Sequence, residues 1–143
     1  MKKYSISEFA TIVGLTTYTL RYYEKQSLIV PDRDANGRRY YTDHDIKWVG
    51  FLLHLKGTGM TMSEIIKYVQ LRAIGDSTIS ERRELLAMVQ ARSLAEIAEK
   101  QANLAVLSHK IDWYDGKLDH TITEDFSHYL QRLKRKDDLN DTK

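Results

Sequence analysis

The first 26 residues alternate short amphipathic stretches with residues that start or stop helices. Ser5 begins a capping-box pattern, apolar residues follow at helical spacing over 6–13, and Gly14 is suited to end that helix. Thr16 is placed to cap a second helix that runs to about residue 26. Two short helices joined by a tight glycine turn predict a helix-turn-helix, although many helical hairpins share this pattern.

Residues 28–41 have the composition of a β-hairpin. Asn36-Gly37 is a strong turn signal, since both residues tolerate positive φ, and β-favouring residues flank it. The pattern predicts a small two-stranded wing, with Arg38 and Arg39 just past its tip.

Two further helices are predicted after the hairpin. Thr42 is placed to cap a third helix, whose apolar positions recur at helical spacing until the glycines of 57–59 break it. A second capping-box pattern at Thr61 opens a fourth helix, which runs to about residue 72. The first half of the chain is therefore predicted to be all-α apart from the wing.

Residues 80–118 contain no proline and no glycine before Gly116, which predicts one helix of unusual length. Its apolar residues fit a heptad seam that is loose near residue 90 and more regular beyond it. Such a seam needs a partner helix, and no second long helix is predicted, so we expect a homodimer. The alternative is a long helix that packs on its own domain. The seam residues expected at the dimer contact are Ile97, Leu104, Leu107, Ile111, Tyr114 and Leu118.

The last part of the chain carries a weaker pattern. Residues 119–123 interrupt the seam, and apolar residues between 122 and 133 predict a short final helix. The charged residues 134–143 are expected to be disordered. The expected division is a winged helix-turn-helix domain at 1–75, a dimerisation helix at 76–118, and a C-terminal helix and tail at 119–143.

The net charge of +2 conceals an uneven distribution. Residues 1–72 contain 11 Lys and Arg against 7 Asp and Glu, whereas the remaining residues contain 11 against 13. Six of the nine tyrosines lie in the first 41 residues. A basic, tyrosine-rich half is the composition that contact with nucleic-acid phosphates requires.

Several classes of protein are excluded by what the sequence lacks. The absence of cysteine excludes disulfides, thiolate metal sites and a thiol nucleophile. Without a signal peptide or an apolar run that spans a membrane, we expect a cytoplasmic protein with no membrane partner. No nucleophile–base pair or phosphate loop stands out and the histidines lack metal spacing, so neither an enzyme nor a cofactor is expected.

The N-terminal half resembles the MerR family of bacterial transcription regulators over about residues 4–72. The resemblance is carried by LRYYE at 20–24, NGRRYY at 36–41 and GMTMSEI at 59–65. Two later segments, 75–79 and 110–114, resemble a narrower branch whose members respond to aldehydes and nitrosative stress.

This resemblance implies a winged helix-turn-helix domain followed by a long helix that dimerises as an antiparallel coiled coil. It also implies a promoter whose two elements are spaced too far apart. The dimer bends and untwists that spacer, and so acts on RNA polymerase through DNA shape. The second helix is expected in the major groove and the wing on the backbone. The expected DNA contacts are Thr17, Tyr18, Arg21, Tyr22, Arg38, Arg39 and Tyr40.

Several of these contacts have a structural alternative, which for Tyr40 is packing within the wing. Arg21 has the spacing to pair with Glu24 or Glu8 instead of DNA, and Tyr22 has the amphipathic character of a core residue. The two wing arginines are also compatible with a solvated wing tip.

The family's sensing chemistry is not supported by this sequence. Branches that sense soft metals or hold iron–sulfur clusters use cysteines, and this chain has none. The aldehyde-responsive branch commonly has a cysteine in the third helix, where this chain has His54, and imidazole forms no thiol adduct. His54 is a candidate sensing residue or an ordinary helix histidine. Trp113 is a candidate residue for a ligand site between subunits. The alternative is that its ring stabilises the dimer through hydrophobic contacts.

The sequence thus predicts a homodimeric, sequence-specific transcription regulator that binds promoter DNA and responds to an unidentified effector or to none. Two alternatives stay open. One is an effector-free architectural protein that bends DNA, and the other is a protein-interaction module that uses the long helix.

Overall fold

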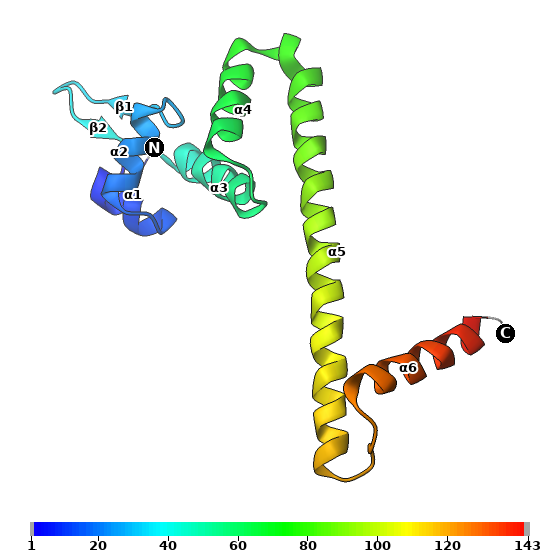
Figure 1. The fold of residues 1–143 in the computed structure, drawn as a ribbon. Coiled ribbons are helices and arrows are strands. Elements are labelled where there is room, and N and C mark those ends of the chain that lie inside the picture. The colour runs from blue at the N-terminus through cyan, green and yellow to red at the C-terminus, as the bar shows by residue number, and fades with distance from the viewer. Residues whose placement is uncertain (1, 142–143) are drawn as a thin grey trace. The chain divides into compact units, whose positions relative to one another are not determined.

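The computed structural model describes residues 2–141, with side chains through residue 139, and Figure 1 shows their arrangement as a ribbon. The elements are α1 (Ile6–Val13), α2 (Thr17–Lys25), β1 (Asp32–Arg33), β2 (Arg39–Tyr40), α3 (Asp43–Gly57), α4 (Met62–Ile74), the short 3-10 turn η1 (Asp76–Thr78), α5 (Ile79–Leu118) and α6 (Phe126–Asp141). This confirms the predicted class, an all-α chain with a small β-wing and a long helix. The chain forms two compact units, residues 1–93 and 94–143, which are described separately.

The helix-turn-helix is set by local hydrogen bonds at its helix ends. Ser5 Oγ accepts the backbone N–H of Glu8 at 3.2 Å, and the Glu8 carboxylate accepts the N–H of Ser5 at 3.1 Å. Gly14 ends α1 with φ of +74°, a conformation that costs glycine little. Thr16 Oγ1 accepts the N–H of Thr19 at 3.1 Å and caps α2. The predicted start of each helix is confirmed.

The wing is an antiparallel pair of two-residue strands, in which Asp32 pairs with Tyr40 and Arg33 with Arg39. Within its turn, Gly37 takes a φ of +78°, and the Asp34 carboxylate accepts backbone N–H groups of the turn at 2.9 and 3.0 Å. The strands begin later than the apolar run at 28–30 suggests. Leu28 and Ile29 are buried in the core of the first unit instead.

The core of the first unit lies where α1, α2, α3 and α4 meet beneath the base of the wing. Its most deeply buried side chains are Phe9, Leu20, Ile29, Tyr41 and Val49. The rings of Phe9 and Tyr41 stack with centroids 4.4 Å apart. Among the described side chains, the Tyr41 hydroxyl is buried without a hydrogen-bond partner, and this burial raises its pKa.

Tyr41→Phe is expected to leave the free energy of unfolding unchanged or to raise it by about 1 kcal/mol. The change keeps the stacked ring and removes a buried polar group that has no partner. Tyr4→Phe is the matched control, because the Tyr4 hydroxyl donates to Asp43 at 2.8 Å and its loss is expected to cost about 1 kcal/mol. Urea unfolding of both variants measures the difference, and an equal loss in both would contradict this interpretation.

The first turns of α5 belong to the first unit. Val89 is buried in the core, and Ser93 Oγ donates to the carbonyl of Thr58 at 2.7 Å. The Arg92 guanidinium donates to both carboxylate oxygens of Glu64, at 2.9 and 3.1 Å. These contacts tie α5 to the start of α4, so this unit extends to residue 93, beyond the domain end expected at residue 75.

Glu64→Gln is expected to destabilise the chain at neutral pH. The Arg92 hydrogen bond, with that of the Thr61 backbone, lowers the pKa of Glu64 from 4.5 to about 2. The carboxylate therefore stabilises the fold above pH 4.5, and its contribution is lost as the pH falls towards 2. Urea midpoints measured from about pH 6 to about pH 3 should decline less steeply in the variant.

Glu84→Gln is the matched control for that experiment. Glu84 pairs with Arg83 at 3.1 Å, but both side chains are more than 70% exposed, so the pair should contribute little. If the decline of the urea midpoint with falling pH becomes as shallow in Glu84→Gln as in Glu64→Gln, the pH dependence does not come from the Glu64–Arg92 pair.

The second unit consists of the rest of α5 and a turn that leads into α6. Trp113 Nε1 donates to the carbonyl of Glu124 at 3.0 Å, and Lys117 Nζ donates to the carbonyl of Thr123 at 2.9 Å. Gly116 lies within α5, and a Cβ there would overlap the Ile122 side chain. Glycine thus permits the close return of the chain after α5.

The expectation of a disordered tail from residue 134 is wrong for the residues that the structure describes there. Helix α6 continues through Asp141, whereas residues 142 and 143 lie outside the described part. Lys134 precedes Asp137 and Asp138 by three and four residues, and Arg135 precedes Asp138 by three, so these opposite charges lie on one side of the helix. Such spacing favours helix where composition alone suggests disorder.

Candidate nucleic-acid interface

One face of α2 carries exposed polar and aromatic side chains, and the opposite face is buried. Tyr18 is 81% exposed and Tyr22 is 41% exposed, whereas Leu20 and Tyr23 belong to the core. Arg21 is exposed between the two exposed tyrosines in sequence. The capped N-terminus of α2 adds unpaired backbone N–H groups at the same end, which favour anions.

The ion pairs that would neutralise Arg21 do not form among the described residues. The Glu8 carboxylate caps α1, and hydrogen bonds from the backbone and side chain of Ser5 lower its pKa. Glu24 pairs with Arg39 Nε at 3.1 Å. Arg21 therefore keeps its charge and its hydrogen-bond donors available for a ligand.

The wing contributes two arginines in different situations. Arg38 is exposed and has no ion pair in the described part of the chain. Arg39 instead joins the wing to the end of α2 through Glu24. A shallow depression of about 270 Å³ lined by Arg21, Glu24, Lys25 and Arg39 marks where the two elements meet. Arg39 is thus placed to hold the wing against α2, which the sequence pattern did not indicate.

The remaining predicted contacts are less exposed. Thr17 is half-buried in the first turn of α2, and Tyr40 is half-buried on the wing. Lys3 Nζ lies 4.5 Å above the ring centre of Tyr40. Lys3 lies beside Tyr40 because the backbone of the neighbouring Tyr4 pairs with that of Tyr41.

Two cations of this surface were missed by sequence reasoning. Lys25 follows Arg21 by four residues and lines the same shallow pocket as Tyr18 and Tyr22, a relation that helical spacing would have revealed. Lys3 had no local signal, because only the pairing of the N-terminal segment with the base of the wing places it beside Tyr40.

The two candidate sensing residues lie in different units. His54 is exposed in the last turns of α3, while Trp113 is half-buried at the end of α5 with its ring edge-on to Phe126. Lys110 Nζ lies over the rings of Trp113 and Phe126, at 4.8 and 4.1 Å from their centres. Within residues 2–141, no group of three or more His, Asp or Glu side chains is arranged to hold a metal ion.

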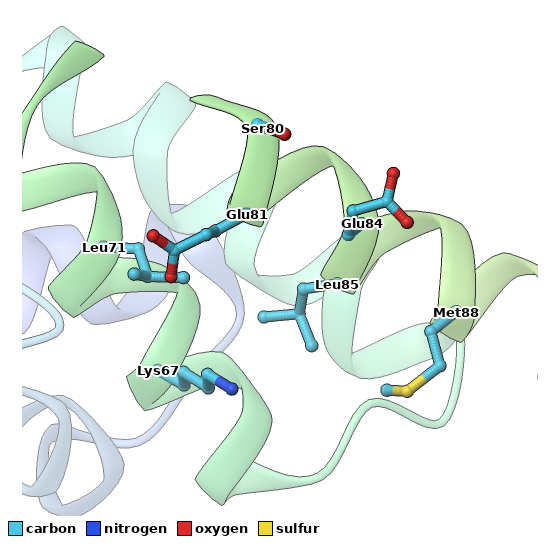
Figure 2. A pocket seen from close by; sticks show the side chains of 7 residues that line it. All are labelled: Lys67, Leu71, Ser80, Glu81, Glu84, Leu85 and Met88. Carbon is cyan, nitrogen blue, oxygen red and sulfur yellow. The ribbon is translucent and has the colours of Figure 1, made fainter. Parts of the chain in front are cut away.

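A separate pocket of about 390 Å³ lies between α4 and the start of α5 in the first unit. Figure 2 shows its apolar lining, which is Leu71 on α4 and Leu85 and Met88 on α5, with charged groups from both helices around them. The charged side chains are Lys67, Glu81 and Glu84. None of the residues predicted to contact DNA lines this pocket.

Comparison with known proteins agrees with the arrangement of α2 and the wing. Residues 4–72 match the model of the MerR HTH family regulatory proteins. An HTH-type transcriptional regulator of Haemophilus influenzae is 36% identical over 113 residues, which is 78% of this chain and 83% of that relative. This chain belongs to the MerR family of helix-turn-helix regulators. The family resemblance found in the sequence is therefore confirmed.

Two other relatives extend this assignment of the MerR-family chain. The regulator AdhR of Bacillus subtilis is 39% identical over 84 residues, which is 58% of this chain and 60% of AdhR. The crystal structure of HiNmlR, a MerR family regulator lacking the sensor domain and bound to promoter DNA, superposes with a TM-score of 0.72. Its sequence is 34% identical, and the match covers 82% of this chain and 94% of HiNmlR.

These relatives are transcriptional regulators, which confirms the expectation that this MerR-family chain is a regulator and not an enzyme. Among the described residues, no helix of this chain is both long enough and apolar enough to cross a membrane.

Proposed function

We propose that the chain is a homodimeric transcription regulator that binds a two-fold symmetric promoter site and controls initiation by distorting the spacer DNA. The observation that carries this proposal is the exposed face of α2 beside the wing, where Arg21 and Arg38 form no ion pair with any described residue and Arg39 pairs with Glu24. The promoter-bound state of HiNmlR supports a DNA partner for the same fold.

The side chains of this surface have distinct roles in the proposed complex. Helix α2 enters the major groove, where Arg21 is placed to contact a guanine edge or a phosphate, and Tyr18 and Thr17 lie near it on the same helix. Tyr22 donates its hydroxyl to a phosphate. Arg38, on the wing, contacts the phosphate backbone of the DNA. Tyr40 joins it there, while Arg39 acts mainly by positioning the wing.

Dimerisation is proposed through α5. Beyond residue 93 this helix has a row of apolar side chains, each at least half exposed, that nothing in a single chain covers among the described residues. The row includes the six predicted seam residues Ile97, Leu104, Leu107, Ile111, Tyr114 and Leu118. Pairing two copies in antiparallel orientation buries both rows and places two recognition helices on one duplex.

DNA distortion follows from the same arrangement. A dimer that holds both half-sites at a spacing set by protein geometry must deform the intervening DNA, and the phosphate contacts offset that cost. RNA polymerase is then affected through the shape of the promoter. By role, we propose DNA contact for residues 1–75 and dimerisation for residues 76–118, and the segment at 119–143 that follows them is given no role.

The test is nuclease protection of the DNA upstream of the chain's own gene, with affinity measured at physiological salt. We expect a two-fold symmetric footprint and binding roughly a thousandfold tighter than to a random duplex. Fluorescence energy transfer between labelled DNA ends should report bending of the protected site. Equal affinity for random duplex would contradict a sequence-specific regulator and favour an architectural protein.

A further inference from the structure

A second shallow pocket, of about 310 Å³, lies between the first turns of α3 and the last turns of α4. It is part of the first unit and shares no lining residue with the surface of α2 and the wing. Its lining consists of three aromatic and three basic side chains: His44, Lys47, Trp48, Phe51, Tyr68 and Arg72. The combination of rings and cations in one concave place is what makes it a candidate ligand site.

The aromatic side chains form a continuous floor. Phe51 lies between the other two rings, with centroid distances of 5.9 Å to Trp48 and 5.8 Å to Tyr68. The indole N–H of Trp48 donates to the carbonyl of Leu28 at 2.7 Å, which satisfies its polar group and orients the ring. The floor therefore presents a preorganised aromatic surface.

The basic side chains of the rim are His44, Lys47 and Arg72. In the part of the chain that the structure describes, no carboxylate forms an ion pair with His44, Lys47 or Arg72. The acids next to them in sequence are engaged elsewhere, since Asp43 accepts the Tyr4 hydroxyl at 2.8 Å and Asp45 accepts the Thr42 N–H at 2.9 Å.

Arg72 is held in place by the floor itself. Its guanidinium carbon lies 4.2 Å from the centre of the Trp48 ring, a cation–π distance. Arg72 is also exposed, so its N–H donors stay accessible, and a guanidinium matches the two oxygens of a carboxylate. The Tyr68 hydroxyl makes no hydrogen bond to another described residue and is a further donor on the lining.

We propose that this pocket binds a small aromatic carboxylate. The carboxylate pairs with Arg72 and Lys47, and the ring of the ligand packs against the aromatic floor at Phe51. A volume near 310 Å³ is at the lower end of ligand pockets, which suits a molecule of one ring. The phosphates of duplex DNA could pair with the basic side chains. The bases of a duplex stay stacked on each other, however, so they would not pack against the aromatic floor. This inference does not depend on the proposed promoter function.

Trp48 provides the reporter for the test. The chain has two tryptophans, so Trp113→Phe leaves the fluorescence of Trp48 alone in the full-length protein. Benzoate is expected to change this fluorescence saturably. Acetate, which lacks the ring, and benzamide, which lacks the charge, should bind at least tenfold more weakly. The absence of a saturable change with benzoate, or an equal response to acetate, would overturn the proposal.

Variants of the rim locate the site. In the Trp113→Phe background, Arg72→Met keeps an unbranched stem over Trp48 and should weaken benzoate binding at least tenfold. Lys47→Met should also weaken benzoate binding, and it serves as the test of the site if Arg72→Met fails to fold. Lys67→Met is the matched control on α4, because Lys67 lines the other pocket, and should change binding less than twofold. Unchanged binding in both rim variants would overturn the proposal.

Measurements of DNA binding test whether the rim residues contact a ligand in this pocket or contact DNA. Arg72→Met and Lys47→Met should bind a promoter fragment within about twofold of the parent chain when benzoate is absent. Arg38→Met, on the wing, serves as the comparison that is expected to lose DNA affinity. A loss in the rim variants equal to that of Arg38→Met would show that these cations contact DNA and would overturn the carboxylate assignment.

Discussion

Arg21→Ala is expected to lower the affinity for the promoter site by about 1–3 kcal/mol, roughly five- to a hundredfold, with the circular dichroism spectrum unchanged. The side chain is exposed on α2 and forms no ion pair with described residues, so its removal should leave the fold intact. If Arg21 reads a base, discrimination between the promoter site and random duplex should fall as well. Fluorescence anisotropy with both duplexes measures the two affinities.

Arg83→Ala is the matched control for this change. Arg83 lies in the same unit and its side chain is 75% exposed, but its partner is Glu84 at the start of α5, away from α2 and the wing in sequence. Its loss removes the same charge from the chain while leaving α2 and the wing untouched. Equal losses of affinity in the two variants would indicate a general effect of net charge and would contradict a specific role for Arg21.

Leu107→Asp is expected to convert the proposed dimer into a monomer at micromolar concentration. Leu107 is 58% exposed in a single chain and lies within the apolar row of α5. Two-fold symmetry would bury two unpaired carboxylates, and we expect this to weaken association by at least ~3 kcal/mol, or more than a hundredfold. Sedimentation velocity measures the change, and promoter affinity should fall with it because a monomer contacts a single half-site.

Ala102→Asp provides the comparison for Leu107→Asp. Residue 102 is exposed on α5 and lies on nearly the opposite side of the helix from the seam, given 100° of rotation per residue. Both changes introduce the same charge and a similar helix penalty. A dimer that survives Leu107→Asp, or dissociates equally in Ala102→Asp, would contradict dimerisation through this row.

The local signals predicted the elements well because each rests on neighbouring residues. Capping by Ser5, Thr16 and Thr61 needs a hydrogen bond that spans three residues, and each of these bonds forms. The prediction of disorder from residue 134 was wrong because it rested on composition. Residues 134–138 are all charged, but basic residues precede aspartates at helical spacing, which favours the helix that the structure describes there.

The surface of α2 and the wing was only partly predictable. Exposure of Tyr18 and burial of Tyr23 follow from helical spacing, which the sequence contains. The different situations of Arg38 and Arg39 do not follow from the sequence, because the two residues are adjacent and have the same side chain. Pairing of Arg39 with Glu24 depends on where the base of the wing meets the end of α2.

The sequence by itself determined the membership of the MerR family, the order and caps of the helices, the wing turn at Gly37, and the long helix with its apolar row. These properties depend on residue type and on spacing of a few positions along the chain. The tertiary structure alone decided that Arg21 has no carboxylate partner among the described residues, that α5 joins the first unit as far as Ser93, and that the Arg72 guanidinium lies over the Trp48 ring. Such contacts join residues far apart in sequence, and their distances are set by the packing of the core rather than by any local pattern.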